Sequence, residues 1–108
     1  MTVAGSDSGG GAGLQADLKT FSALGVYGTS VVTSVTSQNT LGVTGIQNIH
    51  LDIIEKQLHA VLSDIGADAV KTGMLSSSGI IRVAAKILKK HKIKLLVIDP
   101  VMISKSGA

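Results

Sequence analysis

Residues 3–19 read VAGSDSGGGAGLQADLK, and this stretch decides the fold. A short apolar run leads into a glycine-rich turn, and apolar residues at helical spacing begin directly behind it. A strand, turn and helix in this order aim free backbone N–H groups and the positive end of a helix dipole at one point. Glycine also admits positive φ angles and lets a ligand approach the backbone closely. The sequence therefore predicts that this turn holds a polar or anionic group.

Strands alternate with helices along the rest of the chain. Period-2 and apolar runs predict strands, and 3.6-residue periodicity predicts helices. We predict strands at 1–4, 30–35, 43–49, 67–72 and 95–98, and helices at 13–24, 51–65 and 76–91. This alternation is typical of an α/β fold with a mostly parallel, doubly wound sheet and helices on both faces. The 43–49 strand is expected at an edge, and the continuous apolar run 95–98 is expected to be buried on both faces.

Each predicted helix has an apolar side that should face the core. In the first helix it consists of Leu14, Leu18, Phe21 and Leu24; in the second, of Ile54, Leu58, Val61, Leu62 and Ile65; in the third, of Ile80, Ile81, Ala84, Ile87 and Leu88. These residues recur every three to four positions, as the buried stripe of an amphipathic helix does. The periodicity therefore predicts which side of each helix meets the sheet.

Composition excludes several classes of function. The 108 residues contain no cysteine, which rules out disulfides and thiolate zinc sites and fits a cytoplasmic protein. Phe21 and Tyr27 are the only aromatic residues, which leaves almost no base-stacking surface for single-stranded nucleic acid. No apolar run approaches the roughly 20 residues of a membrane span, and no signal-peptide pattern opens the chain.

The net charge of +3 comes largely from the third helix and the turn after it, with Arg82, Lys86, Lys89, Lys90, Lys92 and Lys94. A solvated helix end explains this cluster, and a phosphate-backbone contact is the alternative.

Polar side chains follow the predicted strands at the edge where parallel sheets bind ligands. Gln38 could read the edge of a heterocycle in both hydrogen-bonding directions, and Met74 could pack on a flat ring. Asp99 closes a buried strand, where a carboxylate usually has a metal, a charged partner or a ligand. Asp17 lies one turn into the first helix, where it either faces a ligand or pairs with the helix dipole.

Other functional motifs are not supported, because each of them lacks companion residues that it requires. Residues 11–16 match the dinucleotide fingerprint in its G-x-G-x-x-A form, but no acidic residue stands roughly 20 positions further on. The phosphate-loop pattern G-x-x-x-x-G-K-[ST] does not occur. The serines of the glycine turn have no convincing His and Asp companions, so a nucleophilic triad is not supported.

Four motifs together resemble the hydroxymethylpyrimidine/phosphomethylpyrimidine kinases of the ribokinase-like superfamily. They are AGSDSGGGAGLQADLKTF at 4–21, QNTLGV at 38–43, KTGML at 71–75 and DPVMISKSG at 99–107. The resemblance covers essentially the whole chain in the right order. Bacterial pyridoxal kinases share the first and last motifs, whereas 38–40 is more similar to the pyrimidine kinases.

The resemblance implies an activity and a set of site residues. The family phosphorylates 4-amino-5-hydroxymethyl-2-methylpyrimidine, and then its monophosphate, with MgATP in thiamine biosynthesis. Substrate-binding positions carry over to Gly5 (through its backbone), Asp17, Thr36, Gln38, Met74 and Val101. Thr36 stands where the family often has an apolar residue. Asp99 would lie near the magnesium ion and the transferred phosphate, and Lys105 would offset phosphate charge. The resemblance also implies a cytoplasmic homodimer for the complete protein.

Residues 1–108 match only the N-terminal, substrate-binding part of a single ribokinase-like domain. The ATP-binding half, with its Gly-Thr-Gly-Cys or Gly-Thr-Gly-Asp anion hole and catalytic base, is not in this sequence. We therefore expect no catalytic residue here, weak pyrimidine binding at most and no turnover by the chain alone. Two alternatives stay open: a pyridoxine or pyridoxal kinase, and a non-catalytic pyrimidine-binding module.

Overall fold

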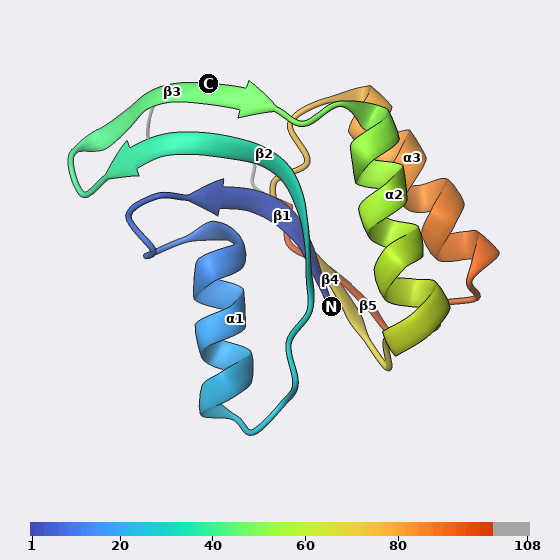
Figure 1. Ribbon diagram of the computed structural model, residues 1–108. Helices are drawn as coiled ribbons and strands as arrows, with labels where there is room; N and C mark the ends of the chain where they lie inside the picture. Colours follow the sequence, from blue (N-terminus) through green and yellow to red (C-terminus); the bar gives the residue numbers. More distant parts are fainter. Residues whose placement is uncertain (101–108) are drawn as a thin grey trace.

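A computed structural model describes residues 1–100 (Figure 1). Strands and helices alternate along the chain, as the sequence predicts. The strands are β1 (Thr2–Asp7), β2 (Ser30–Asn39), β3 (Gly42–Asn48), β4 (Val70–Thr72) and β5 (Leu96–Ile98). The helices are α1 (Gly13–Ala23), α2 (Leu51–Ala60), a π-helical turn η1 (Val61–Ile65) that continues α2, and α3 (Ser78–Lys90).

The five strands form one sheet in the order β3-β2-β1-β4-β5. β1 is parallel to both β2 and β4, and β4 is parallel to β5. Only β3 runs antiparallel, paired with β2 through a hairpin at one edge of the sheet. The mostly parallel sheet and the edge position of the 43–49 segment are thus confirmed.

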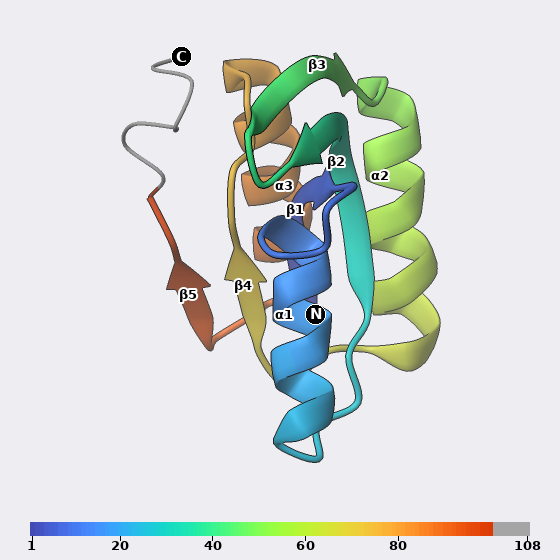
Figure 2. The same cartoon turned by 90° about the vertical axis from the view of Figure 1, so that its left-hand side faces the viewer.

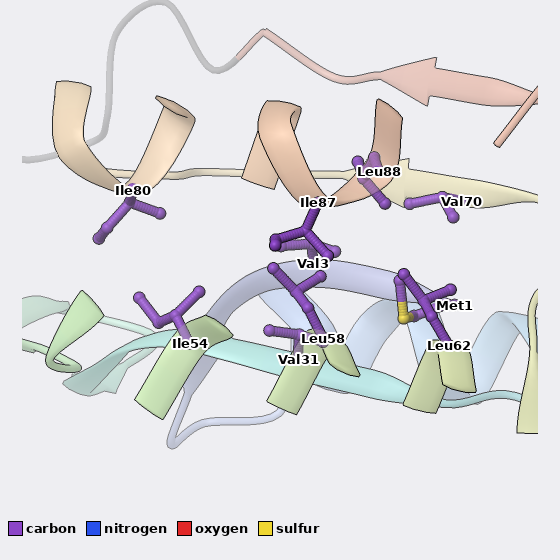
Figure 3. Close-up of a cluster of buried hydrophobic side chains, with 10 residues drawn as sticks. All are labelled: Met1, Val3, Val31, Ile54, Leu58, Leu62, Val70, Ile80, Ile87 and Leu88. Atoms are coloured by element: carbon purple, nitrogen blue, oxygen red, sulfur yellow. The ribbon is translucent and has the colours of Figure 1, made fainter. Parts of the chain in front are cut away.

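The helices cover opposite faces of the sheet. Figures 1 and 2 show α1 on one face and α2 with α3 on the other. The apolar core lies between the sheet and the α2–α3 pair (Figure 3). It consists of Met1, Val3, Val31 and Val70 from the sheet side, Ile54, Leu58 and Leu62 from α2 and η1, and Ile80, Ile87 and Leu88 from α3. None of the helices in the described part of the chain combines the length and the apolar character that a membrane span requires.

Some predicted core positions are on the surface. Ile65 is 55% exposed because the last turn of the second helix widens to π geometry, in which the Gly66 N–H bonds the Val61 carbonyl five residues back. The wider turn rotates Ile65 away from the apolar side of the helix that faces the core. Ile81 is 52% exposed because α3 presents Ile80, Ala84, Ile87 and Leu88 to the core and leaves the neighbouring position on its flank. In α1 only Leu14 is buried.

The second strand is longer than predicted. β2 continues through residues 36–39, which the sequence analysis placed in a strand end and turn, and pairs there with β3. Asn39 closes the hairpin, because its Oδ1 accepts hydrogen bonds from the N–H groups of Leu41 and Gly42. Gln38 is therefore held in a strand, which restricts its backbone more than a turn would.

The prediction that the 95–98 run is buried on both faces is wrong for the described residues. β5 is the outermost strand, beside β4 (Figure 2), and its three side chains are between 44% and 66% exposed. The core cluster ends at β4 and contains no β5 side chain. The apolar run at 95–98 thus predicts the strand β5 correctly, but it does not predict whether other elements cover the two faces of that strand.

The amino group of Met1 extends the β1–β4 ladder by donating a hydrogen bond to the Ala69 carbonyl, at 2.9 Å. Partial burial lowers the pKa of this amino group below its usual 8.0, and the charge of Asp68 opposes that shift. Between the folded pKa and 8.0 the unfolded chain binds more protons, so the free energy of unfolding should rise with pH through this window. Urea unfolding of the chain beginning at Met1, between pH 6 and 9, measures the effect. An Nα-acetylated chain should lack this component, and equal pH slopes for the two chains would contradict the prediction.

Candidate functional site

The glycine turn between β1 and α1 already encloses a carboxylate. Asp7, at the end of β1, is only 6% exposed. Its Oδ1 accepts a hydrogen bond from the Gly9 N–H at 2.7 Å. Its Oδ2 accepts from the N–H groups of Gly11 and Ala12, at 3.0 and 2.8 Å. The anion in this backbone nest is therefore the chain's own side chain, and the prediction of a ligand anion at these N–H groups is not supported.

Further contacts tie the turn to the strands around it. The Ser8 hydroxyl donates to the Gln38 carbonyl and accepts from the Gln38 N–H, at 2.6 and 2.7 Å. Gln15 of α1 accepts from the Asp7 N–H and donates to the Ser6 hydroxyl. These bonds fix the start of α1 against the ends of β1 and β2. The turn is thus held in one conformation by side-chain hydrogen bonds to β1, β2 and α1.

Gly5 and Met74, two of the predicted substrate residues, lie close together at the carboxyl ends of β1 and β4. These strands are adjacent and parallel, and the helices that follow them, α1 and α3, lie on opposite faces, so the crevice beyond them is a topological switch point. A side chain added at Gly5 would lie 2.7 Å from Ser34 Oγ and 3.3 Å from Met74 Cε. The close approach of Ser34 Oγ, with the Met74 methyl group beside it, thus explains the glycine. Ser34 Oγ is buried and has no hydrogen-bond partner among the described residues.

Thr36 and Gln38 form a second pair, on the neighbouring strand β2. The Thr36 hydroxyl donates to the Ser6 carbonyl at 2.7 Å and lies 3.1 Å from Gln38 Oε1. Ser6 directly follows Gly5, so both pairs border the same end of β1. Thr36 is buried and Gln38 is half-buried. The single proton of this hydroxyl can serve only one of the two oxygens, so Thr36 is a polar neighbour of the Gln38 amide, which an apolar residue at this position would not be.

Asp17 lies apart from these pairs, on the α1 side of the sheet. Its Oδ1 and Oδ2 are 3.1 and 2.9 Å from Lys71 Nζ, and the Thr2 hydroxyl donates to Oδ2 at 2.6 Å. The alternative in which Asp17 only pairs with the helix dipole is thus replaced by a specific ion pair. The ammonium and the carboxylate are 21% and 16% exposed, so the pair is partly desolvated.

Asp99 follows β5 and borders the same ammonium. Its Oδ2 lies 3.9 Å from Lys71 Nζ, and its backbone N–H donates to the Thr72 carbonyl. Its side chain is largely exposed, and its oxygen atoms are ligands that Mg²⁺ accepts. Within residues 1–100 no three metal-ligating side chains of His, Cys, Asp or Glu converge on a point. Asp99 could supply one oxygen ligand to a divalent cation. Val101 and Lys105 lie outside the described residues.

Two of the hollows on the described surface are not lined by Asp17, Gln38 or Met74. One of about 370 Å³ lies over β2 and β3 and touches Ser8 and Thr36. The other, of about 450 Å³, lies at the amino-terminal ends of β1 and β4 and touches Lys71. Of the predicted substrate residues in the described part of the chain, Thr36 alone lines one of these two hollows.

Sequence reasoning missed three polar residues of this region: Asp7, Thr2 and Lys71. Lys71 carried a local signal, since a lysine in the middle of a short strand between Val70 and Thr72 needs a partner when its strand is covered. Asp7 and Thr2 carried none that distinguishes them from ordinary turn and strand residues. Their partners became visible only when the elements were placed together.

Known proteins are similar to this chain in sequence and in fold. The family model described as "Phosphomethylpyrimidine kinase" matches residues 7–108. The hydroxymethylpyrimidine/phosphomethylpyrimidine kinase of Rhizobium meliloti is 53% identical over 99% of this chain and 40% of its own length. The crystal structure of phosphomethylpyrimidine kinase from Clostridium difficile 630 superposes with a TM-score of 0.93 at 59% identity, over 99% of this chain and 46% of that one.

Pyridoxal kinases are similar as well, at lower identity. The Staphylococcus aureus pyridoxal kinase in complex with AMP-PCP and pyridoxal superposes with a TM-score of 0.84 at 42% identity, over 98% of this chain and 39% of that one. The chain spans between 20% and 40% of the length of the curated relatives it matches. The match to the family model extends over nearly all of the sequence, from the glycine turn onward. The chain belongs to the phosphomethylpyrimidine kinase family.

Proposed function

We propose that the protein carrying this chain phosphorylates 4-amino-5-hydroxymethyl-2-methylpyrimidine and then its monophosphate, using ATP, in thiamine biosynthesis. The observation that carries this proposal is the 59% identity and TM-score of 0.93 to the Clostridium difficile phosphomethylpyrimidine kinase. The geometry agrees with it, because amide, thioether and backbone groups border one strand end. An aminopyrimidine offers a donor and acceptor edge and a flat ring for such groups.

Each substrate-binding residue has a distinct role in this proposal. Gln38, whose Oε1 lies beside the Thr36 hydroxyl, reads the donor and acceptor edge of the ring. Asp17 accepts from the amino group, and Met74 packs on the ring face over the Gly5 backbone. Val101 completes the contacts. The buried Ser34 hydroxyl borders Gly5.

Residues 1–108 would form the N-terminal, substrate-binding part of one ribokinase-like domain. ATP would be bound mainly by a C-terminal half, which would also supply the catalytic base, so the chain alone should not turn over. Asp99 would contribute an oxygen ligand to Mg²⁺, and Lys105 would offset phosphate charge. When bound, the magnesium–ATP complex supplies the phosphoryl group and neutralises part of its charge. We further propose that the complete protein is a cytoplasmic homodimer.

The test compares two substrates on the full-length protein. With ATP in excess, kcat/KM for the pyrimidine alcohol should exceed that for pyridoxal by at least about tenfold. Gln38→Ala should lower kcat/KM for the pyrimidine by about 10- to 100-fold, because a hydrogen-bonding site that loses its partner discriminates strongly. A preference for pyridoxal would make the protein a pyridoxal kinase. Saturable pyrimidine binding without phosphorylation would instead identify a non-catalytic binding module.

A further inference from the structure

Lys71 joins two carboxylates that lie on different elements. Its Nζ contacts both oxygens of Asp17 on α1, at 3.1 and 2.9 Å, and lies 3.9 Å from Oδ2 of Asp99 after β5. Lys71 itself is the middle residue of β4, three residues before Met74. One ammonium group thus connects the residue assigned to the pyrimidine amino group with the residue assigned to the phosphate end.

We propose that Lys71 is a positioning residue for the pyrimidine, acting through Asp17. This inference rests on the proposed function. Oδ2 of Asp17 accepts from both Thr2 and Lys71, whereas Oδ1 accepts from Lys71 alone. A carboxylate has about four lone-pair directions, so Oδ1 keeps capacity for the amino group of a substrate. The two donors come from β1 and β4, and together they fix the rotation of a side chain that belongs to α1.

Electrostatics supports the same role. Asp17 is 16% exposed, and a carboxylate in such surroundings is costly unless a cation compensates it. Asp99 adds a second negative charge, with its Oδ2 3.9 Å from the same ammonium. Without Lys71 the two carboxylates would lose their common counterion and repel each other. Asp17 would then turn toward solvent, and its Oδ1 would leave the position that the substrate needs.

Lysine suits this position because its ammonium is a compact charge with three donors. Those donors can serve both oxygens of Asp17 and still face Asp99. An arginine carries the same charge and can bridge a carboxylate with two parallel bonds, so Lys71→Arg should preserve most of the contact. Lys71→Met keeps much of the apolar stem and removes the charge. The two variants therefore separate the charge from the packing.

Steady-state kinetics of the full-length protein tests the proposal. Lys71→Met should raise KM for the pyrimidine alcohol at least about tenfold and change kcat by less than about threefold, because binding is lost equally from the substrate and transition-state complexes. Lys71→Arg should restore KM to within about threefold of wild type. Lys89→Met, on the exposed last turn of α3, is the matched control and should leave both constants unchanged.

A double-mutant cycle distinguishes positioning from a general structural role. Asp17→Asn should also raise KM, and adding Lys71→Met to it should have little further effect, since both changes break the same link. Multiplied effects would overturn the proposal, as would an unchanged KM in Lys71→Met. If Lys71→Met does not fold, Thr2→Val removes the other donor to Asp17 without a charge change and should raise KM about threefold; an unchanged KM would overturn the proposal. If the wild-type protein has no pyrimidine kinase activity, the proposed function itself is wrong. This outcome is established with the wild-type protein alone and is therefore distinct from the results with the Lys71 variants.

Discussion

Replacing Asp7 by alanine should lower the free energy of unfolding by about 2–4 kcal/mol. Its carboxylate accepts three backbone N–H bonds, and hydrogen bonds to a charged group are each worth roughly 1.5–3 kcal/mol. The sum is reduced because Gly9, Gly11 and Ala12 are near the surface, where water can replace part of the lost bonding. Without the carboxylate, the N–H groups at the start of α1 have no anion to face and the turn loses its shape.

Urea denaturation of the Asp7→Ala variant measures this loss. Asp64→Ala is the matched control, because Asp64 is an exposed acidic residue on η1, and its removal should change stability by less than about 0.5 kcal/mol. Asp7→Asn should fall between the two, since an amide keeps one acceptor and points its NH₂ at a backbone donor. Equal losses for Asp7→Ala and Asp64→Ala would show that the nest does not stabilise the fold.

Gly13→Ala is the second change with a large expected effect, a loss of about 3 kcal/mol or more. Gly13 is the first residue of α1 and has a φ of +59°, a conformation that costs other residues roughly 1–2 kcal/mol. A methyl group there would also collide with the Gly5 carbonyl oxygen. That oxygen is backbone and cannot rotate away, so β1 and α1 would have to separate, at an overpacking cost of roughly 1–3 kcal/mol.

Gly25→Ala separates the two causes. Gly25 follows α1 and also has a positive φ, of +74°, but nothing lies within 4 Å of an added methyl group. Its loss should therefore stay near 1 kcal/mol, the cost of the backbone conformation alone. The difference between the two variants in urea denaturation measures the collision at Gly5. Similar losses would mean that the contact between the turn and β1 is not tight.

The local pattern was sufficient for most elements. Helices α2 and α3 follow from residues such as Ile54, Leu58, Ile80 and Ile87, whose spacing is set by backbone geometry within one turn. Apolar runs bounded by glycine and polar residues located the strands for the same reason. Where the backbone departs from regular geometry, as in the π turn that exposes Ile65, periodicity fails because it assumes a constant number of residues per turn.

Contacts between distant residues decided the rest. The sequence by itself determined the order of strands and helices, the parallel α/β class, and the residues that carry the family resemblance. Only the tertiary structure decided that the glycine turn encloses Asp7, that Gln38 is held in a strand by pairing with β3, and that β5 is exposed. It also paired Asp17 with Lys71, which is 54 residues away. Such partners depend on how helices and strands are stacked, because a side chain's charge partner is set by position in space and not by position along the chain.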